Sequence, residues 1–229
     1  MALPSAFPAA LQWGRQWASR QLRSGAWVRA VLAALTVTVI GRGFDLFAFT
    51  PDAKRAHALG LQTGALVGAY WAALCPSTLT ALRDADDGWS AMLRSSSAGV
   101  GGLWWGAWGA QIALGIVIVG ISMVSTTVFS ILSDLPVSLD LPALGSAGVA
   151  VVLVGLIASA ASVWWGSVAG SLVALLTFAA GQTGTDLSMR ALGPAPVGQA
   201  LSASDTLRTV VLAVGAVAIT QAGLRRLRR

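Results

Sequence analysis

Few side chains in this 229-residue chain could carry out chemistry. Cys75 is the only cysteine, His57 is the only histidine, and no glutamate is present. One chain therefore cannot build a disulfide framework or a Cys/His metal site. The sequence also contains no GxxxxGK[ST] phosphate loop, no HExxH motif and no GxSxG motif with suitable partners. We therefore expect no catalytic residue, no metal site and no ATP site in this chain, and a protein that is not an enzyme.

Arg42 and Asp45 place opposite charges inside an otherwise apolar run. Residues three apart share a helix face, so these two side chains can pair. An ionisable group inside a membrane costs about 2.5–3.5 kcal/mol and usually faces protein or water. The pair is either a polar point on a substrate route or a neutralised pair that marks the end of a membrane span.

A second group of charges lies in the stretch LRDADDGWSAMLRSSSAG, residues 82–99. Three aspartates come first and Arg94 comes last, which suits the two ends of a helix dipole. Trp89, Met92 and Leu93 have the i, i+3, i+4 spacing of one helix face. The pattern predicts a short helix with an apolar face. This face either rests on the membrane with Trp89 as its anchor or docks on a cytoplasmic partner.

The composition defines the class of protein that carries these residues. Only 10% of the residues are charged and 55% are hydrophobic, whereas soluble domains carry about 25% charged residues. Residues 141–185 contain no ionisable side chain, and about 20 apolar residues suffice to cross a bilayer. The net charge of +6 does not indicate nucleic acid, because four arginines form the terminal RRLRR, typical of a cytoplasmic anchor. We predict an all-α polytopic membrane protein that contacts the lipid bilayer and no nucleic acid.

Residues 1–26 are predicted to form an N-terminal amphipathic segment at the membrane interface. In a helix over residues 9–23, Trp13 and Trp17 fall on one arc, while Arg15, Arg20 and Arg23 fall on the opposite arc. Such a helix suits the headgroup layer of an anionic leaflet. The alternative is an amphipathic helix that packs on a partner protein.

Residues 27–229 form the predicted transmembrane domain. Apolar runs predict six transmembrane helices, at about residues 27–49, 59–79, 103–132, 142–163, 165–184 and 206–224. The fourth and fifth share one uncharged run, and we place their boundary within residues 162–166. A cytoplasmic segment covers residues 80–102 and an outer segment covers residues 181–205. The outer segment contains Gly-Pro-Ala-Pro, so it cannot be a regular helix throughout, and it is apolar enough to be partly re-entrant.

Arginine placement sets the predicted orientation. With the N-terminus inside, ten of the 15 basic residues lie on the cytoplasmic side, as the positive-inside rule requires. All 10 tryptophans then lie in the cytoplasmic half, several of them at the interface that such residues prefer. We expect a multi-pass protein of the bacterial plasma membrane with both termini in the cytoplasm.

Gly60, Gly64 and Gly68 recur every four residues along the second predicted span. Small residues at this spacing form a ridge that lets two helix backbones approach closely. The ridge predicts either packing inside the subunit or an interface between subunits. The sequence favours neither alternative.

The stretch between the second and third spans resembles the coupling segment of the type-2 ABC-transporter permeases. That segment looks like R-E-x-G-T-x-E-x-L-L followed by a serine-rich turn. The residues that carry the resemblance are Arg83, Asp84, Asp87, Gly88, Trp89, Met92, Leu93 and Ser95, Ser96 and Ser97. Trp89 stands where the family usually has a small hydroxyl residue. These permeases also have an interfacial first helix, six spans, both termini inside and a partly re-entrant segment before the last span.

The resemblance implies a function and a set of partners. It makes the chain the membrane subunit of an ABC exporter of a small hydrophobic or amphipathic compound. A separate ABC ATPase subunit binds ATP and Mg in such a transporter. It would contact the ATPase-coupling residues Asp87, Gly88, Trp89, Met92, Leu93 and Arg94. A second permease subunit, identical or different, completes a dimer, and substrate passes along their interface near Arg42 and Asp45. The alternatives are a haem-exporter B-type permease and a non-transporting scaffold or assembly subunit that binds a cytoplasmic partner.

Overall fold

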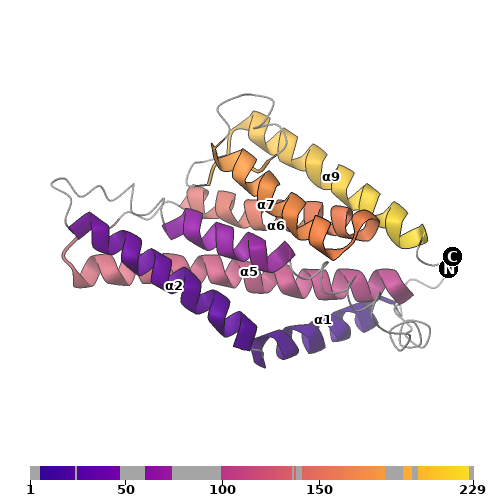
Figure 1. Ribbon diagram of the computed structural model, residues 1–229, viewed down its shortest axis with the longest axis horizontal. Coiled ribbons are helices and arrows are strands. Elements are labelled where there is room, and N and C mark those ends of the chain that lie inside the picture. The colour runs from indigo at the N-terminus through magenta and orange to yellow at the C-terminus, as the bar shows by residue number, and fades with distance from the viewer. Residues whose placement is uncertain are drawn as a thin grey trace.

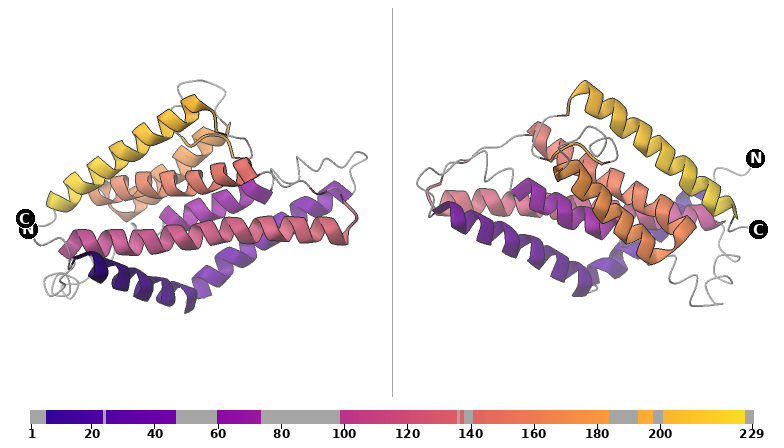
Figure 2. Two further views of the ribbon diagram at one scale, coloured as in Figure 1. Left: turned by 180° about the vertical axis from the view of Figure 1, so that it is seen from behind. Right: turned by 45° about the horizontal axis from the view of Figure 1, so that its top comes forward.

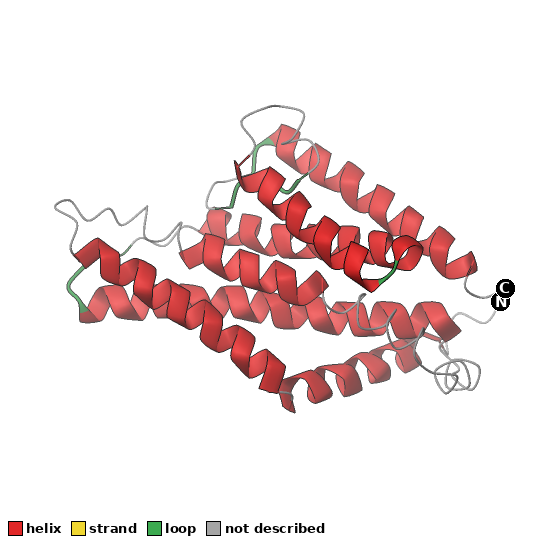
Figure 3. Ribbon diagram, in the orientation of Figure 1, coloured by secondary structure: helices red, strands yellow, loops and turns green. Residues whose placement is uncertain are grey.

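The computed structural model describes residues 6–23, 25–46, 60–73, 99–135, 137, 141–183, 193–197 and 201–226, without side chains for 6, 7, 41–46, 167 and 183. The regular structure in these residues consists of seven helices and no strand (Figure 3). They are α1 (Ala6–Arg23), α2 (Gly25–Leu46), helix 60–73, α5 (Gly99–Leu132), α6 (Leu141–Trp165), α7 (Ser167–Thr183) and α9 (Ala203–Arg226). The prediction of an all-α protein is confirmed, and a helix lies at each of the six predicted span positions.

Three helices in the described part of the chain, α5, α6 and α9, are each long and apolar enough to cross a membrane. The helices α1 and α2 pass the same test as a pair, although they are bent by 66° relative to each other. A shorter apolar helix, Val168–Gln182, lies within α7. These lengths and compositions agree with the prediction of a multi-pass membrane protein.

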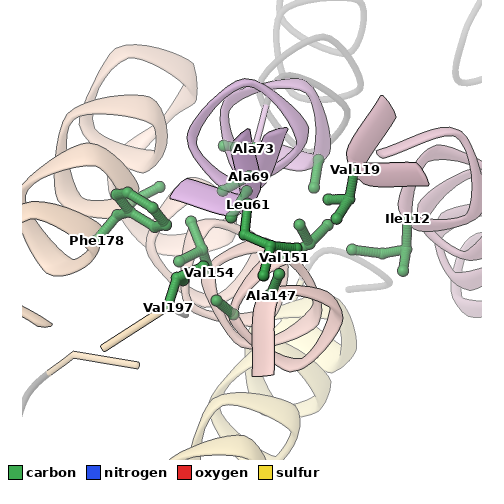
Figure 4. Close-up of a cluster of buried hydrophobic side chains, with 14 of the residues drawn as sticks. Leu61, Ala69, Ala73, Ile112, Val119, Ala147, Val151, Val154, Phe178 and Val197 are labelled. Carbon is green, nitrogen blue, oxygen red and sulfur yellow. The ribbon is translucent and has the colours of Figure 1, made fainter. Parts of the chain in front are cut away.

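The helices run back and forth along the long axis of the molecule, with α5 and α6 at its centre (Figure 1). The helix α5 contacts α1 and α2, and α6 contacts α7 and α9. The main hydrophobic core joins helix 60–73 to α5, α6 and α7 (Figure 4). Its labelled members include Leu61 and Ala69 from helix 60–73, Val119 from α5, Val151 from α6 and Phe178 from α7. One face of helix 60–73 is therefore packed against its neighbours, while Leu66 and Tyr70 on its other face are exposed.

The first turn of α1 and the last turn of α9 lie at the same end of the molecule (Figures 1 and 2). A hydrophobic cluster at this end contains Trp17, Trp104 and Leu224, with Trp13 and Trp105 packed against it. We call this region the tryptophan-rich end. The cluster joins α1, the first turns of α5, the end of α6 and the last turn of α9.

The helix α1 turns its tryptophan face inward, onto α5. Trp17 is buried, and a Cβ on Gly14 would lie 2.8 Å from the Gly106 carbonyl oxygen. The arginines of α1 are exposed, as the amphipathic pattern predicts. In the structure this tryptophan face packs against α5. The glycines Gly14 and Gly106 let the two backbones approach closely enough to bury it.

Two helix boundaries depend on glycine. The helix α5 begins at Gly99, whereas the sequence predicts a start near residue 103, so the end of the predicted segment 80–102 is helical. Glycine has low helix propensity, but Gly101 and Leu103 are buried, and this packing outweighs propensity. The break between α6 and α7 lies at Gly166, inside the predicted stretch 162–166. Its φ of 88° is a conformation that glycine adopts without steric cost.

The described part of the outer segment, residues 193–197, is irregular and folds back onto α7. The Gln182 side chain donates to the Ala195 carbonyl oxygen (3.4 Å) and accepts from the Val197 backbone nitrogen (2.8 Å). Val197 is 2% exposed and joins the same core cluster as Phe178. Irregular backbone at membrane depth is tolerated where protein buries it. The irregular backbone agrees with the Gly-Pro-Ala-Pro sequence, and the re-entrant position of the segment stays a prediction.

The helix α9 begins with a capping box. The Asp205 backbone nitrogen donates to Ser202 Oγ (3.1 Å), and the Ser202 backbone nitrogen donates to Asp205 Oδ2 (3.3 Å). Two backbone donors that have no partner within the helix are thereby satisfied. Asp205 also pairs with Arg208 at 3.1 Å. These contacts determine where the last helix starts.

Candidate functional site at the tryptophan-rich end

The predicted coupling residues Asp87, Gly88, Trp89, Met92, Leu93 and Arg94 lie outside the described residues. The structure places the two helices that flank them, helix 60–73 and α5. Arg42 and Asp45 lie in the helical backbone of α2, with their side chains outside the description. The helical spacing of these two residues agrees with the sequence analysis, and their pairing stays a prediction.

The glycine ridge of helix 60–73 lies against α5. A Cβ on Gly68 would lie 2.6 Å from the Gly115 carbonyl oxygen, and a Cβ on Gly64 would lie 3.0 Å from the Val119 Cα atom. Gly60 continues the row against a threonine side chain of α5. Such short distances mean that the two backbones touch, which only glycine permits at these positions. The structure thus shows the ridge packing inside the subunit.

A buried glutamine, Gln111, joins three helices near the tryptophan-rich end. The residue is 2% exposed, so both polar atoms of its amide need partners inside the protein. Its Nε2 donates to the Trp71 carbonyl oxygen (3.0 Å), and its Oε1 accepts from Trp17 Nε1 (3.1 Å). These bonds connect α5 to α1 and to the last turn of helix 60–73. The sequence analysis missed Gln111, although a lone amide within an apolar run of α5 was a visible signal.

Two further indoles connect helices at the same end. Trp104 Nε1 donates to Ser159 Oγ (2.7 Å) and joins α5 to α6. Trp164 Nε1 donates to the Ile219 carbonyl oxygen (3.1 Å) and joins α6 to α9. The guanidinium carbon of Arg226 lies 5.7 Å from the centre of the Trp164 ring, within cation–π range. Hydrogen bonds from tryptophans therefore bind successive helices to one another here.

A groove of about 540 Å³ lies between α2, helix 60–73 and α7. It is lined by Ala26, Arg29, Ala30, Ala33, Leu66, Val67, Tyr70, Trp71 and Leu175. The polar groups among these are the Arg29 guanidinium, the Tyr70 hydroxyl and Trp71 Nε1. The last of these has no hydrogen-bond partner among the described residues. Mostly apolar walls with a few polar groups are typical of small-molecule sites, which have volumes of about 300–1,000 Å³.

Comparison of the chain with protein-family models, with curated proteins and with solved structures gives no significant match. Within the described residues, no group of three or more His, Cys, Asp or Glu side chains could hold a metal ion. The feature of this region that bears on function is the set of connections between its helices. Gln111 and the glycine ridge connect α1, helix 60–73 and α5 to one another.

Proposed function

We propose that this protein is the membrane subunit of an ATP-driven exporter of the type-2 ABC class. Its six spans are α2, helix 60–73, α5, α6, α7 and α9, with α1 at the cytoplasmic face. Both termini lie in the cytoplasm of a bacterial cell. A separate ATPase subunit binds ATP and Mg, and two permease subunits form the transporter. The substrate is a small hydrophobic or amphipathic compound.

The observation that carries this proposal is the connection between helix 60–73 and α5 at the tryptophan-rich end. These helices flank the coupling segment, and Gln111 and the glycine ridge bind them to each other and to α1. A force that an ATPase applies to residues 87–94 would therefore move the three helices together. Coupling requires helices that move as one unit. The ATPase can shift the transporter between two conformations only through contacts that differ between these conformations.

The groove beside α7 supports a substrate route at a subunit interface. Its walls come from the first, second and fifth proposed spans, which are α2, helix 60–73 and α7. The helices α2 and α7 also expose Leu32, Leu172 and Leu176. A second permease subunit that covers these side chains would convert the groove into a cavity between the subunits. Arg42 and Asp45 lie near the C-terminal end of α2, whereas Arg29 lies near its start. At that end they would contact substrate as it leaves.

The coupling assignment is tested by a double variant, Trp89→Ala with Met92→Ala, copurified with the proposed ATPase subunit. Trp165→Ala is the matched control, because it removes a tryptophan that is 73% exposed at the end of α6. We expect the double variant to fold normally but to lose about tenfold in ATP-driven transport in proteoliposomes, within the usual range of coupling energies. The control should transport at the wild-type rate.

Each remaining outcome separates the alternatives. Unchanged ATPase association and unchanged transport in the double variant would refute the docking assignment. Stable binding of a soluble partner that does not depend on nucleotide would favour the scaffold alternative. Loss of transport in Trp165→Ala to the same extent would show that the tryptophans act through general stability.

A further inference from the structure

A second groove, of about 400 Å³, lies between α1 and α5. It is lined by Ala10, Leu11, Gly14, Arg15, Ala18, Trp105, Gly106, Gly109 and Ala110. It shares no lining residue with the groove beside α7. Its volume also falls within the range of about 300–1,000 Å³ that small-molecule sites have. Nothing in the proposed coupling or substrate route uses it.

Small residues shape this groove. At Gly14 and Gly106 the two helix backbones touch, since a Cβ on Gly14 would lie 2.8 Å from the Gly106 carbonyl oxygen. At Gly109, further along α5, no atom lies within 4 Å of the place that a Cβ would take. The helices therefore leave a gap beside this close contact. Leu11, which is 51% exposed, adds apolar surface to this gap.

The charge of the groove is positive. Arg15 is exposed and is the only charged side chain among the lining residues. The Trp105 indole adds apolar wall, since its ring packs against Trp108 and its Nε1 is buried. Neither α1 nor α5 contains an aspartate or glutamate, and α1 carries two further arginines. A ligand with a negative, acceptor-rich head and an apolar chain complements this combination.

We propose that this groove binds one phospholipid with an anionic headgroup, for which phosphatidylglycerol serves as the probe. The phosphate pairs with Arg15 in a charge-assisted hydrogen bond, and an acyl chain lies over Leu11 and Gly109. Basic pockets between helices at a membrane surface recognise anionic headgroups in this way. Tryptophans concentrate at the headgroup level, which places the tryptophan-rich end at the correct depth. This site does not depend on the transport proposal.

The test uses the purified full chain in detergent, titrated with fluorescent phosphatidylglycerol and with phosphatidylcholine that has the same acyl chains. Arg15→Gln should weaken phosphatidylglycerol binding about fivefold, the effect of one basic residue near an anionic surface, and leave phosphatidylcholine binding unchanged. Arg20→Gln removes an exposed arginine of α1 that does not line the groove, and it should change either affinity by less than about twofold.

A second pair of variants tests the apolar part of the groove. Gly109→Leu fills the gap and should weaken binding of both lipids about tenfold or more. Gly120→Leu, in equally open space on α5, should leave both affinities unchanged. If Gly109→Leu does not fold, as judged by circular dichroism and gel filtration, Ala18→Leu fills the groove from the α1 wall and carries the same expectation.

Three results would overturn the proposal. Equal losses in Arg15→Gln and Arg20→Gln would show attraction to the charge of α1 as a whole. Unchanged phosphatidylglycerol binding in a folded groove-filling variant would show that lipid does not occupy the groove. Dissociation of a dimer by Gly109→Leu, with lipid binding intact, would show that a second copy of the chain covers this surface.

Discussion

Helix 60–73 and α9 are both apolar, yet they are buried to different extents. Leu61, Ala65 and Ala72 of helix 60–73 are completely buried. In contrast, Leu207 and Val214 of α9 are 67% and 64% exposed. Hydropathy alone does not distinguish a helix that faces protein from one that faces lipid, because lipid tails are as apolar as leucine. What distinguishes the two helices is how closely their backbones approach a neighbour.

Glycines make this difference measurable. A Cβ on Gly68 of helix 60–73 would lie 2.6 Å from the Gly115 carbonyl oxygen, whereas a Cβ on Gly215 of α9 would meet no atom within 4 Å. Helices inside a bilayer gain little from hydrophobic burial, so close packing and hydrogen bonds hold them together. A glycine in contact with a neighbouring backbone therefore stabilises the bundle, and a glycine in open space does not.

The largest effect is expected for Gly68→Leu. The Gly115 backbone cannot move aside as a side chain can, so overpacking should lower the free energy of unfolding by about 3 kcal/mol. Gly215→Leu adds the same atoms in open space and improves helix propensity. It should leave the free energy of unfolding within about 0.5 kcal/mol of the wild type or raise it. Unfolding of both variants in SDS–detergent mixtures measures the difference.

Two outcomes would change this comparison. Equal unfolding free energies for Gly68→Leu and Gly215→Leu would contradict the close packing of helix 60–73 on α5. A folded Gly68→Leu monomer that no longer forms a dimer would assign the glycine ridge to a subunit interface. Gel filtration with light scattering distinguishes these outcomes from simple loss of stability.

An intermediate effect is expected for Gln111→Leu. The substitution leaves Trp17 Nε1 and the Trp71 carbonyl oxygen without their present partner, which should lower the free energy of unfolding by about 1–2 kcal/mol. Gln62→Leu on the exposed face of helix 60–73 is the control and should change it by less than about 0.5 kcal/mol. A Gln111→Leu protein as stable as the wild type would show that the tryptophan-rich end does not depend on this amide.

The smallest effect is expected for the bond between Trp104 and Ser159. Trp104→Phe and Ser159→Ala each remove the 2.7 Å hydrogen bond. A double-mutant cycle should give a coupling energy of about 0.6 kcal/mol, the average for such pairs in membrane proteins. Full additivity of the two single effects, measured in the same unfolding assay, would contradict a contribution of this bond to stability.

The positions of the helices could be predicted from the sequence, because a long apolar run in a membrane has few alternatives to a helix. The break at Gly166 could also be predicted from the sequence, since this glycine lies next to two bulky tryptophans in an uncharged run. The start of α5 at Gly99 could not be predicted from the sequence. Its glycine-rich first turn has low propensity, and burial of Gly101 and Leu103 decides the outcome.

The candidate site was predictable only in part. The spacing of the glycines at 60, 64 and 68 indicated a packing ridge, but it did not identify α5 as the partner. Periodicity places the two tryptophans of α1 on one apolar face, but only the structure shows that Trp17 donates a hydrogen bond to Gln111, 94 residues away. Periodicity identifies an apolar face of a helix, but it does not show what covers that face.

The sequence by itself determined an all-helical chain with long apolar segments and a basic amphipathic first helix, because these features depend on local composition and spacing. Only the tertiary structure decided which faces lie against protein. Gly68 meets Gly115, and Trp17 meets Gln111, through contacts between residues far apart in the chain. The physical reason is that an apolar surface is equally compatible with lipid and with protein, so the choice depends on which neighbouring helix fits closely enough to make contact.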